Sequence, residues 1–384
     1  MLKDAEECVK SFEDTCIRCG LCAQTNCGMF QDGTTTLGDV CEAILSGDTT
    51  HDSFPFACAL CNRCVAHCPV DLRASDAMKP ARSILLDKYP SLEGNFNKFR
   101  VENEFNFFTM IKSMYDGDES KVTKIVSKPT GNASADRTAF FPGCSLFAYA
   151  PKLVEKTFNW LREKGYAAHV VTVCCGAPLD LGGFADRYNA HMDGLLNWLK
   201  TQGIDSLILV CPDCNEHFEE PLQRHGFNKI MLPEVLLKEG MAIEGGKKVA
   251  VHDSCYDRFS GEIGKSVRKL LANSEIVKLP HEYKDALCCG GGGLVSGYAP
   301  DMCDYRRLLR LQEFDALDLD YVVSACFSCV NSLQRSADKT KVYHYLELLF
   351  DEEIDWDKAY ERVGKYFGDP KYQQICEQSD LMFS

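Results

Sequence analysis

The feature that most constrains the fold is a set of five cysteines that the chain contains twice. Each set is a lone cysteine, then a Cys-Cys-Gly triplet, then a Cys-x-x-Cys pair. The first set is Cys144, Cys174, Cys175, Cys211 and Cys214, and the second is Cys255, Cys288, Cys289, Cys326 and Cys329. Equivalent positions lie 111 (255 − 144), 114 (288 − 174) and 115 (326 − 211) residues apart. Recurrence of order and spacing indicates an internal duplication, so we expect two similar halves.

Two groups of four cysteines precede the duplication. They are Cys16, Cys19, Cys22 and Cys27, spaced C-x2-C-x2-C-x4-C, and Cys58, Cys61, Cys64 and Cys68, spaced C-x2-C-x2-C-x3-C before Pro69. The second group has the spacing of bacterial ferredoxins, and the first differs by one extra residue and by Gly28 where proline is usual. In two-cluster ferredoxins the fourth cysteine of each run ligates the other cluster. This rule predicts one [4Fe–4S] cluster on Cys16, Cys19, Cys22 and Cys68, and another on Cys58, Cys61, Cys64 and Cys27. Structural zinc, the alternative, prefers two C-x-x-C pairs.

Composition narrows the class of protein further. The chain has 384 residues, 22 of them cysteine, and a formal net charge of −14. The negative charge disfavours nucleic acid and anionic lipid as partners. We find no signal peptide and no membrane span, so the expected location is the cytoplasm, with contact to the inner face of a membrane only through a partner. Without an export signal, this many cysteines indicates metal or redox chemistry rather than a disulfide framework.

The hydrophobic patterns predict a multidomain α+β and α/β protein. Apolar residues recur at helical spacing up to about residue 115, and the 30-residue interval between Cys27 and Cys58 favours a helical ferredoxin domain. Short apolar strands then alternate with helices, which implies parallel sheets whose carboxyl ends carry the cysteines. The predicted domains are a ferredoxin-type domain (1–115), a polar linker (116–137), two similar α/β domains (138–245 and 246–350) and a C-terminal tail (351–384).

Five thiolates in each half suit a larger cluster better than a single metal ion. Adjacent Cys174 and Cys175 point in different directions, so they can bind two irons but are poor joint ligands of one tetrahedral ion. Soft thiolates select iron–sulfur clusters, zinc or Cu(I). Zinc needs four ligands and would leave one cysteine of each set unused, and it remains the alternative.

These motifs resemble the CCG-domain proteins, a family of iron–sulfur oxidoreductases and subunits. The resemblance runs from Cys16 to Cys329. It rests on Phe141-Pro142-Gly143-Cys144, Cys174-Cys175-Gly176-Ala177-Pro178, Cys211-Pro212-Asp213-Cys214, His252-Asp253-Ser254-Cys255, Cys288-Cys289-Gly290 and Cys326-Phe327-Ser328-Cys329. The order of a helical ferredoxin domain and two CCG domains looks most like the D-type catalytic subunit of heterodisulfide reductase. Family members often continue the second motif as His-Asp-Pro-Cys-His-Leu-Gly-Arg, whereas this chain has Ser254, Tyr256, Asp257 and Arg258.

The resemblance implies four [4Fe–4S] clusters, two cubane and two noncubane, each noncubane cluster on one five-cysteine set. It implies that electrons pass through the ferredoxin clusters to the CCG clusters and reduce a small disulfide between them. The alternative is a non-catalytic subunit that carries electrons between a flavin dehydrogenase, or an electron-transfer flavoprotein, and a quinone or cytochrome partner. Either role implies a redox partner subunit, which is a flavoprotein or a membrane cytochrome b or quinone-reactive subunit, and an anaerobic setting.

Several residues outside the cysteine sets are candidates for function. His252, Asp253 and Tyr256 flank a predicted ligand and could donate protons or position substrate, although such neighbours more often only hydrogen-bond the ligand loop. The glycines of the triplets, Gly176, Gly290 and Gly291, are predicted to bring backbone N–H groups to cluster sulfurs, the alternative being a flexible turn within Gly290–Gly293. His67 is predicted to be a surface or packing residue. Four cysteines are predicted not to be ligands: Cys8, Cys41, Cys303 and Cys376.

Overall fold

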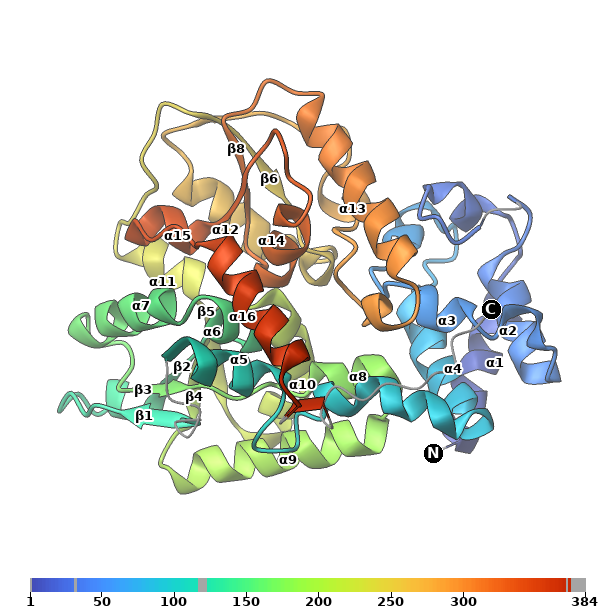
Figure 1. The fold of residues 1–384 in the computed structure, drawn as a ribbon, viewed down its shortest axis with the longest axis horizontal. Coiled ribbons are helices and arrows are strands. Elements are labelled where there is room, and N and C mark those ends of the chain that lie inside the picture. Colours follow the sequence, from blue (N-terminus) through green and yellow to red (C-terminus); the bar gives the residue numbers. More distant parts are fainter. Residues whose placement is uncertain (1, 31–32, 117–122, 371, 374–384) are drawn as a thin grey trace.

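The computed structural model describes residues 2–30, 33–116, 123–370 and 372–373. The N-terminal domain is helical, as the sequence predicts, and lies to one side of the molecule (Figure 1). Its elements are α1 (Leu2–Thr15), η1 (Leu21–Thr25), α2 (Leu37–Ser46), η2 (Thr49–His51), α3 (Phe54–Ala57), η3 (Arg63–His67), α4 (Ala74–Lys88) and η4 (Pro90–Phe99). The next helix, α5 (Phe107–Asp116), packs instead against the first α/β domain (Figure 1). The short 3-10 helices η1 and η3 follow the first cysteines of the two ferredoxin runs, so each run is wound into a tight turn.

The first α/β domain is built on a five-stranded sheet in the order β1-β3-β2-β4-β5. Its strands are β1 (Ile125–Ser127), β2 (Thr138–Phe141), β3 (His169–Val171), β4 (Ser206–Leu209) and β5 (Asn228–Met231), and its helices are α6 (Cys144–Tyr149), α7 (Pro151–Glu163), α8 (Ala177–Gly182), α9 (Ala185–Thr201), α10 (Pro212–His225) and α11 (Leu232–Lys238). Strands β2 to β5 are parallel, and β1 is an antiparallel edge strand. The stretch that the sequence assigned to a linker therefore contributes β1 to this sheet.

The second α/β domain repeats the arrangement with a four-stranded parallel sheet in the order β7-β6-β8-β9. Its elements are β6 (Lys248–His252), η6 (Cys255–Asp257), α12 (Glu262–Leu270), β7 (Glu275–Ile276), η7 (Tyr283–Asp285), η8 (Val295–Gly297), α13 (Pro300–Asp315), β8 (Tyr321–Ser324), α14 (Phe327–Gln334), β9 (Val342–His344) and α15 (Tyr345–Phe350). A last helix, α16 (Trp356–Gly368), packs on α5 and buries Tyr366, so part of the predicted tail belongs to the folded body.

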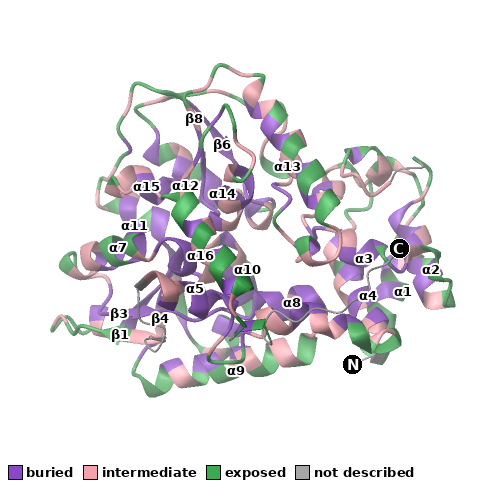
Figure 2. Cartoon of the chain, in the orientation of Figure 1, coloured by how far each residue is buried: buried purple, intermediate pink, exposed green. Residues whose placement is uncertain are grey.

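The two α/β domains contact each other through pairs of helices. Helix α6 packs against α14, and α11 packs against α12. The central strands of both sheets are buried (Figure 2), so each sheet is covered by helices on both faces. Helix α13 reaches from the second α/β domain to the N-terminal domain (Figure 1). Within the described residues, no helix combines the length and the apolar character needed to cross a membrane.

Candidate iron–sulfur centre

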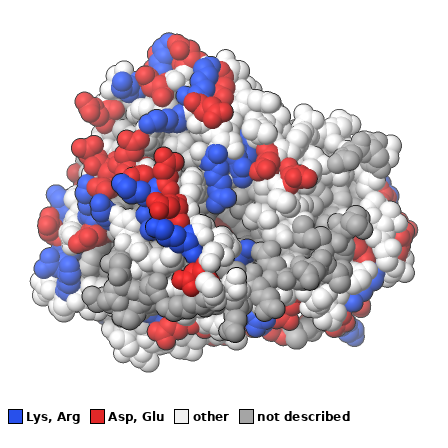
Figure 3. Space-filling view, viewed as in Figure 1, with Lys and Arg blue, Asp and Glu red and all other residues white. Residues whose placement is uncertain are grey.

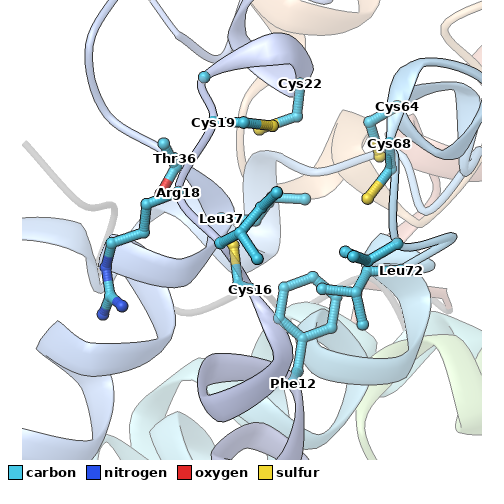
Figure 4. A pocket seen from close by; sticks show the side chains of 13 residues that line it. Phe12, Cys16, Arg18, Cys19, Cys22, Thr36, Leu37, Cys64, Cys68 and Leu72 are labelled. Carbon is cyan, nitrogen blue, oxygen red and sulfur yellow. The ribbon is translucent and has the colours of Figure 1, made fainter.

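The first ferredoxin site gathers the thiols that the crossover rule assigns to one cluster. A small cavity is lined by Cys16, Cys19, Cys22 and Cys68, with Cys64 beside them. Figure 4 shows Cys19 and Cys22 on one side, Cys64 and Cys68 on the other, and Cys16 below, while the side chain of Arg18 points away from the sulfurs. The sulfur donors and the apolar lining that includes Phe12 fit a cubane cluster better than a zinc ion bound to two C-x-x-C pairs.

The second ferredoxin site shows the complementary crossover. Cys27 from the first run lines a cavity together with Cys58, Cys61 and Cys64. Burial raises the pKa of Cys58 to about 11, and burial also raises the pKa of Cys64 well above its usual value. The thiols of Cys58 and Cys64 therefore keep their protons when free, and metal binding would have to displace them.

The first five-cysteine set, which we call the first cysteine site, lies at the carboxyl end of the first sheet. Strand β2 ends just before Cys144, β3 leads to Cys174 and Cys175, and β4 leads to Cys211. The Sγ atoms of Cys175 and Cys214 are 3.4 Å apart, whereas Cys174 is in hydrogen-bonding contact with Cys144. Cys174 and Cys175 are also in hydrogen-bonding contact with each other, and their other contacts go to different cysteines, Cys144 and Cys214.

The second five-cysteine set, the second cysteine site, is placed in the same way by β6 and β8. Strand β6 leads to Cys255 and β8 leads to Cys326. Cys289 is in hydrogen-bonding contact with Cys329, and Cys288 with Cys61 of the second ferredoxin site. The His252 ring and the thiols of Cys289 and Cys329 also offer ligand atoms within 4.8 Å of one another. Arg310 donates to His252 Nδ1 at 3.1 Å, which leaves only Nε2 to face the thiols.

A single cavity of about 240 Å³ joins the two cysteine sites. Nine of the ten cysteines line it, with Cys288 facing the second ferredoxin site instead: Cys144, Cys174, Cys175, Cys211, Cys214, Cys255, Cys289, Cys326 and Cys329. Ser145 and Ser328, whose hydroxyls are 3.1 Å apart, link the two halves at this cavity. The charged groups of the lining are Asp213, Arg307 and Arg335. Figure 3 shows a few basic side chains near the middle of the face, with acidic side chains on either side.

Of the three residues suggested for proton transfer or substrate positioning, Tyr256 lines the cavity. Burial raises its pKa well above the usual value of tyrosine, so its phenol keeps its proton. His252 is buried beside Arg310, and burial lowers its pKa to about 3. Asp253 forms an ion pair with Arg268 (2.6 Å) and accepts a hydrogen bond from the Tyr283 amide (2.8 Å). The sequence could not separate these roles, because all three positions adjoin the same ligand.

The glycine run Gly290–Gly293, which begins in the second triplet, has two structural roles. The Gly290 amide donates to Cys288 Sγ (3.3 Å) and the Gly291 amide donates to Cys289 Sγ (3.4 Å). Gly293 has a φ of +64°, and a Cβ atom there would lie 2.7 Å from the Ala59 carbonyl carbon. The run therefore also lets the N-terminal domain approach closely. In the first triplet, Gly176 has a φ of +90° and faces the His191 ring.

The structure also shows a charged tie that the sequence analysis did not identify. His217 on α10 contacts Asp213 (2.8 Å) through Nδ1 and Asp180 (3.1 Å) through Nε2, and Lys79 contacts Asp180 at 2.7 Å. The two carboxylates hold the pKa of His217 well above its usual range despite its burial. The tie joins the Cys-Cys-Gly loop to the Cys-x-x-Cys helix. The sequence gives little indication of this tie, because its members Asp213, Asp180 and Lys79 lie on three separate helices.

Of the remaining cysteines, the three that the structure describes lie apart from the predicted ligand sets, with one partial exception. Cys8 is exposed, Cys41 is buried behind Cys16, and Cys303 is buried but contributes to the lining of the shared cavity. Cys376 lies outside the described residues. His67 contacts Asp285 at 2.9 Å, so it packs between the N-terminal and second α/β domains.

Comparisons with known proteins agree with this geometry. The sequence profile described as the cysteine-rich (CCG) domain matches the chain twice, at residues 138–219 and 249–334. An iron–sulfur protein of Methanococcus maripaludis, named as uncharacterized, is 23% identical over 297 residues, which are 76% of this chain and 59% of that protein. One of the subunits of the CoM/CoB fumarate reductase of Methanothermobacter marburgensis is 24% identical over 307 residues, 77% of this chain and 60% of that protein.

A shorter match covers 29% of this chain and 27% of the iron–sulfur subunit of glycolate oxidase from Escherichia coli, at 27% identity over 113 residues. The chain spans about 60% of the length of the methanogen relatives. The duplicated cysteine pattern, the two α/β domains and the repeated profile match have one explanation: the chain contains two copies of the cysteine-rich (CCG) domain and is similar to iron–sulfur proteins that carry it.

Proposed function

We propose that this chain is the disulfide-reducing subunit of an iron–sulfur oxidoreductase. The observation that carries the proposal is the shared cavity, because both five-cysteine sites open into it. Reduction of a disulfide, RSSR′ + 2e⁻ + 2H⁺ → RSH + R′SH, needs two electrons and must trap two sulfurs. Two facing thiolate-rich sites meet both needs. The named activity of the fumarate reductase relative, with CoM and CoB, supports a thiol or disulfide as the small-molecule partner.

The donor sets fit four [4Fe–4S] clusters, two ferredoxin-type and two of the noncubane CCG type, which when bound would supply one-electron carriers. Cys16, Cys19, Cys22 and Cys68 would hold one, and Cys27, Cys58, Cys61 and Cys64 another. The two cysteine sites would hold the other two. The electrons would come from a partner subunit of the flavoprotein or cytochrome class, consistent with a relative that is itself a named subunit.

The side chains of the cavity provide the surroundings that disulfide reduction requires. Phe99, Phe107 and Phe108 form an apolar wall that excludes water from the thiols. Tyr256 holds a proton beside Cys255 and can donate a hydrogen bond to a departing thiolate. Arg307 and Arg335 add positive charge at the α13 and α14 side, where two thiolates would form.

The proposal is tested by anaerobic iron and acid-labile sulfide analysis, followed by EPR of the oxidised protein with and without coenzyme M. About sixteen irons, the sum of four [4Fe–4S] clusters, and a thiol-dependent paramagnetic signal are the expected result. The same iron content without any thiol response would instead favour an electron-carrying subunit that links a flavoprotein to a quinone or cytochrome partner. Zinc in place of iron would exclude both functions.

A further inference from the structure

The second ferredoxin site is surrounded by three buried arginines that lack carboxylate partners. Arg82, Arg258 and Arg306 are 0%, 3% and 4% exposed. Among the described residues, none of the three forms an ion pair with an aspartate or glutamate. Other buried arginines do have such a partner, since Arg310 pairs with Glu313 and Arg63 with Asp285. A buried cation without a counter-charge is strongly unfavourable, so these three require an anionic group nearby.

Each of the three arginines donates to the carbonyl of a different cysteine of this site. Arg82 Nη2 donates to Cys58 O (2.8 Å), Arg258 Nε to Cys61 O (2.9 Å) and Arg306 Nε to Cys27 O (2.9 Å). They come from α4, from the residue after η6 and from α13, so two of them belong to the second α/β domain. The guanidinium groups therefore converge on one site from three separate segments.

Of the three arginines, Arg306 gives the clearest indication of an anionic group nearby. Its Nη1 atom is buried and has no hydrogen-bond partner, and the side chain lines the cavity formed by Cys27, Cys58, Cys61 and Cys64. The same guanidinium lies near Cys288 of the second cysteine site. An unpartnered buried donor at a cavity lined by four thiols points to an anionic occupant of that cavity.

The first ferredoxin site has the opposite surroundings. The cation in its lining, Arg18, pairs with Glu13 (2.8 Å), Asp39 (2.9 Å) and Glu42 (2.7 Å). One arginine faces three carboxylates, and its side chain points away from the thiols (Figure 4). Net charge near a cluster is one of the factors that set its reduction potential. An electron added to the second site is stabilised by three buried positive charges, and an electron added to the first site is not.

We propose that Arg82, Arg258 and Arg306 form a cationic cage that gives the cluster of the second ferredoxin site a higher reduction potential than the cluster of the first. Electron transfer from the first cluster to the second would then be favourable: it would oxidise the first by one electron and reduce the second by one electron, and it would require no proton. The second site is then the exit of the N-terminal domain toward Cys288. The inference rests on the cluster content of the proposed function, but not on disulfide chemistry.

The test is an EPR-monitored redox titration of the full chain, purified anaerobically, with the second-site signal assigned in a Cys19→Ala background. In Arg306→Gln, the ratio of reduced to oxidised second-site cluster at a fixed potential should fall about tenfold, which corresponds to a midpoint about 59 mV lower for one electron. Arg306→Lys keeps the charge and should restore most of the potential. The control is Arg224→Gln, an exposed arginine on α10 paired with Asp193, which should leave it unchanged.

If Arg306→Gln does not accumulate as folded protein, Arg258→Gln removes a second member of the cage and should shift the same midpoint in the same direction. An unchanged second-site midpoint in an iron-replete Arg306→Gln or Arg258→Gln protein would overturn the cage. A lowered midpoint in a protein that shows no response to thiols would uphold the cage and reject disulfide reduction. Absence of iron from the wild-type second site would reject both.

Discussion

The first and second cysteine sites share a scaffold but are held by groups of different charge. In the first, the charged His217 ties Asp180 to Asp213. The equivalent position in the second, three residues after the last cysteine, is Ser332, whose neutral hydroxyl donates to Cys289 O at 2.7 Å. Both residues join the Cys-Cys-Gly loop to the Cys-x-x-Cys helix. The duplicated halves thus retain the cysteines and the position of the tie, while the chemistry of the tie has changed.

The two cysteine sites also differ in how they contact the N-terminal domain. At the second cysteine site, Cys288 contacts Cys61, and Arg258 and Arg306 extend from the second α/β domain to the ferredoxin cysteines. At the first, the groups of α4 that bridge to this half, Lys79, Arg82 and Ser83, bond Asp180 of the tie and the carbonyls of Leu181 and Gly183 rather than a cysteine carbonyl of that half. The second half therefore contacts the ferredoxin cysteines directly, and under the proposed function it would be the half that receives electrons. Four predictions test this contrast.

The largest effect is expected from removing one ligand of each cysteine site. Cys175→Ala and Cys289→Ala should each lose about four of about sixteen irons, one [4Fe–4S] cluster, because each thiol is buried at the centre of its set. Only Cys289→Ala should also alter the EPR spectrum of the second ferredoxin site, since that site adjoins the second set alone. Cys303→Ala is the matched control and should keep all the iron. Loss of iron from Cys303→Ala would show that the ligand sets are assigned incorrectly.

The next largest effect is expected from removing the charged tie made by His217, and it should exceed the effect of removing the neutral tie made by Ser332. His217→Leu leaves the partly buried Asp213 without its cationic partner; breaking a fully buried ion pair costs about 3–5 kcal/mol, and the 26% exposure of the Asp213 side chain places the loss at or below the lower end of that range. Hydrogen exchange of α8 and α10 in the variant should report this loss as a lower free energy of opening, while protection of α14 stays near that of the wild type. Equal loosening of both halves would mean that the tie is not local to the first cysteine site.

How much of this was predictable depends on the distance in sequence between the interacting groups. The crossed ligand sets of the ferredoxin sites are a prediction from local spacing, and in the structure Cys27 lines a cavity with Cys58 while Cys68 lines one with Cys16. The duplication likewise predicted two α/β domains with cysteines beyond the carboxyl ends of their strands. These features are encoded within runs of a few residues or in a repeat, so they can be identified without tertiary information.

The charged surroundings of the sites could not be predicted in this way. Arg82, Arg258 and Arg306 lie far apart in the sequence, and no motif distinguishes any of them from an exposed arginine. Strand β1 escaped prediction for a related reason, because three residues in a polar stretch become a strand only by pairing with β3. Packing of distant segments decides both features, and local pattern carries little information about it.

A smaller effect is expected from the neutral tie. Ser332→Ala removes the hydroxyl that donates to Cys289 O, and one hydrogen bond of this kind contributes about 1 kcal/mol. The variant should load its iron normally and show slightly faster hydrogen exchange in α14 only. A loss as large as that of His217→Leu would remove the contrast between the two ties.

The smallest expected effect is a pH dependence of stability, which should differ between the two α/β domains. Burial lowers the pKa of His344, in the second α/β domain, to about 3, so the folded state holds this imidazole neutral between Ala325 O (3.1 Å) and the Leu346 amide (3.4 Å). The stability that it contributes is present above the unfolded-state pKa of about 6.5 and is lost as pH falls toward 3. At pH 5.5 the loss is about 1 kcal/mol. The charged His217 of the first half has the opposite sign: its pKa is raised, so its contribution is complete below about 6.5 and is lost progressively as pH rises from there toward the raised pKa.

Hydrogen exchange of β8 and β9, corrected for the intrinsic rate, should therefore show less protection at pH 5.5 than at pH 7.5, whereas β2 and β4 of the first half should show no such loss at pH 5.5, because the His217 contribution is larger at the lower pH. His344→Gln has no imidazole to titrate and should remove about 1 kcal/mol of this dependence, while its stability at pH 7.5 reports separately any cost of the altered hydrogen bonds. If β8 and β9 lose the same protection in His344→Gln as in the wild type, the acid sensitivity of the second half has another source, and the contrast between a charged first half and a neutral second half does not extend to His344.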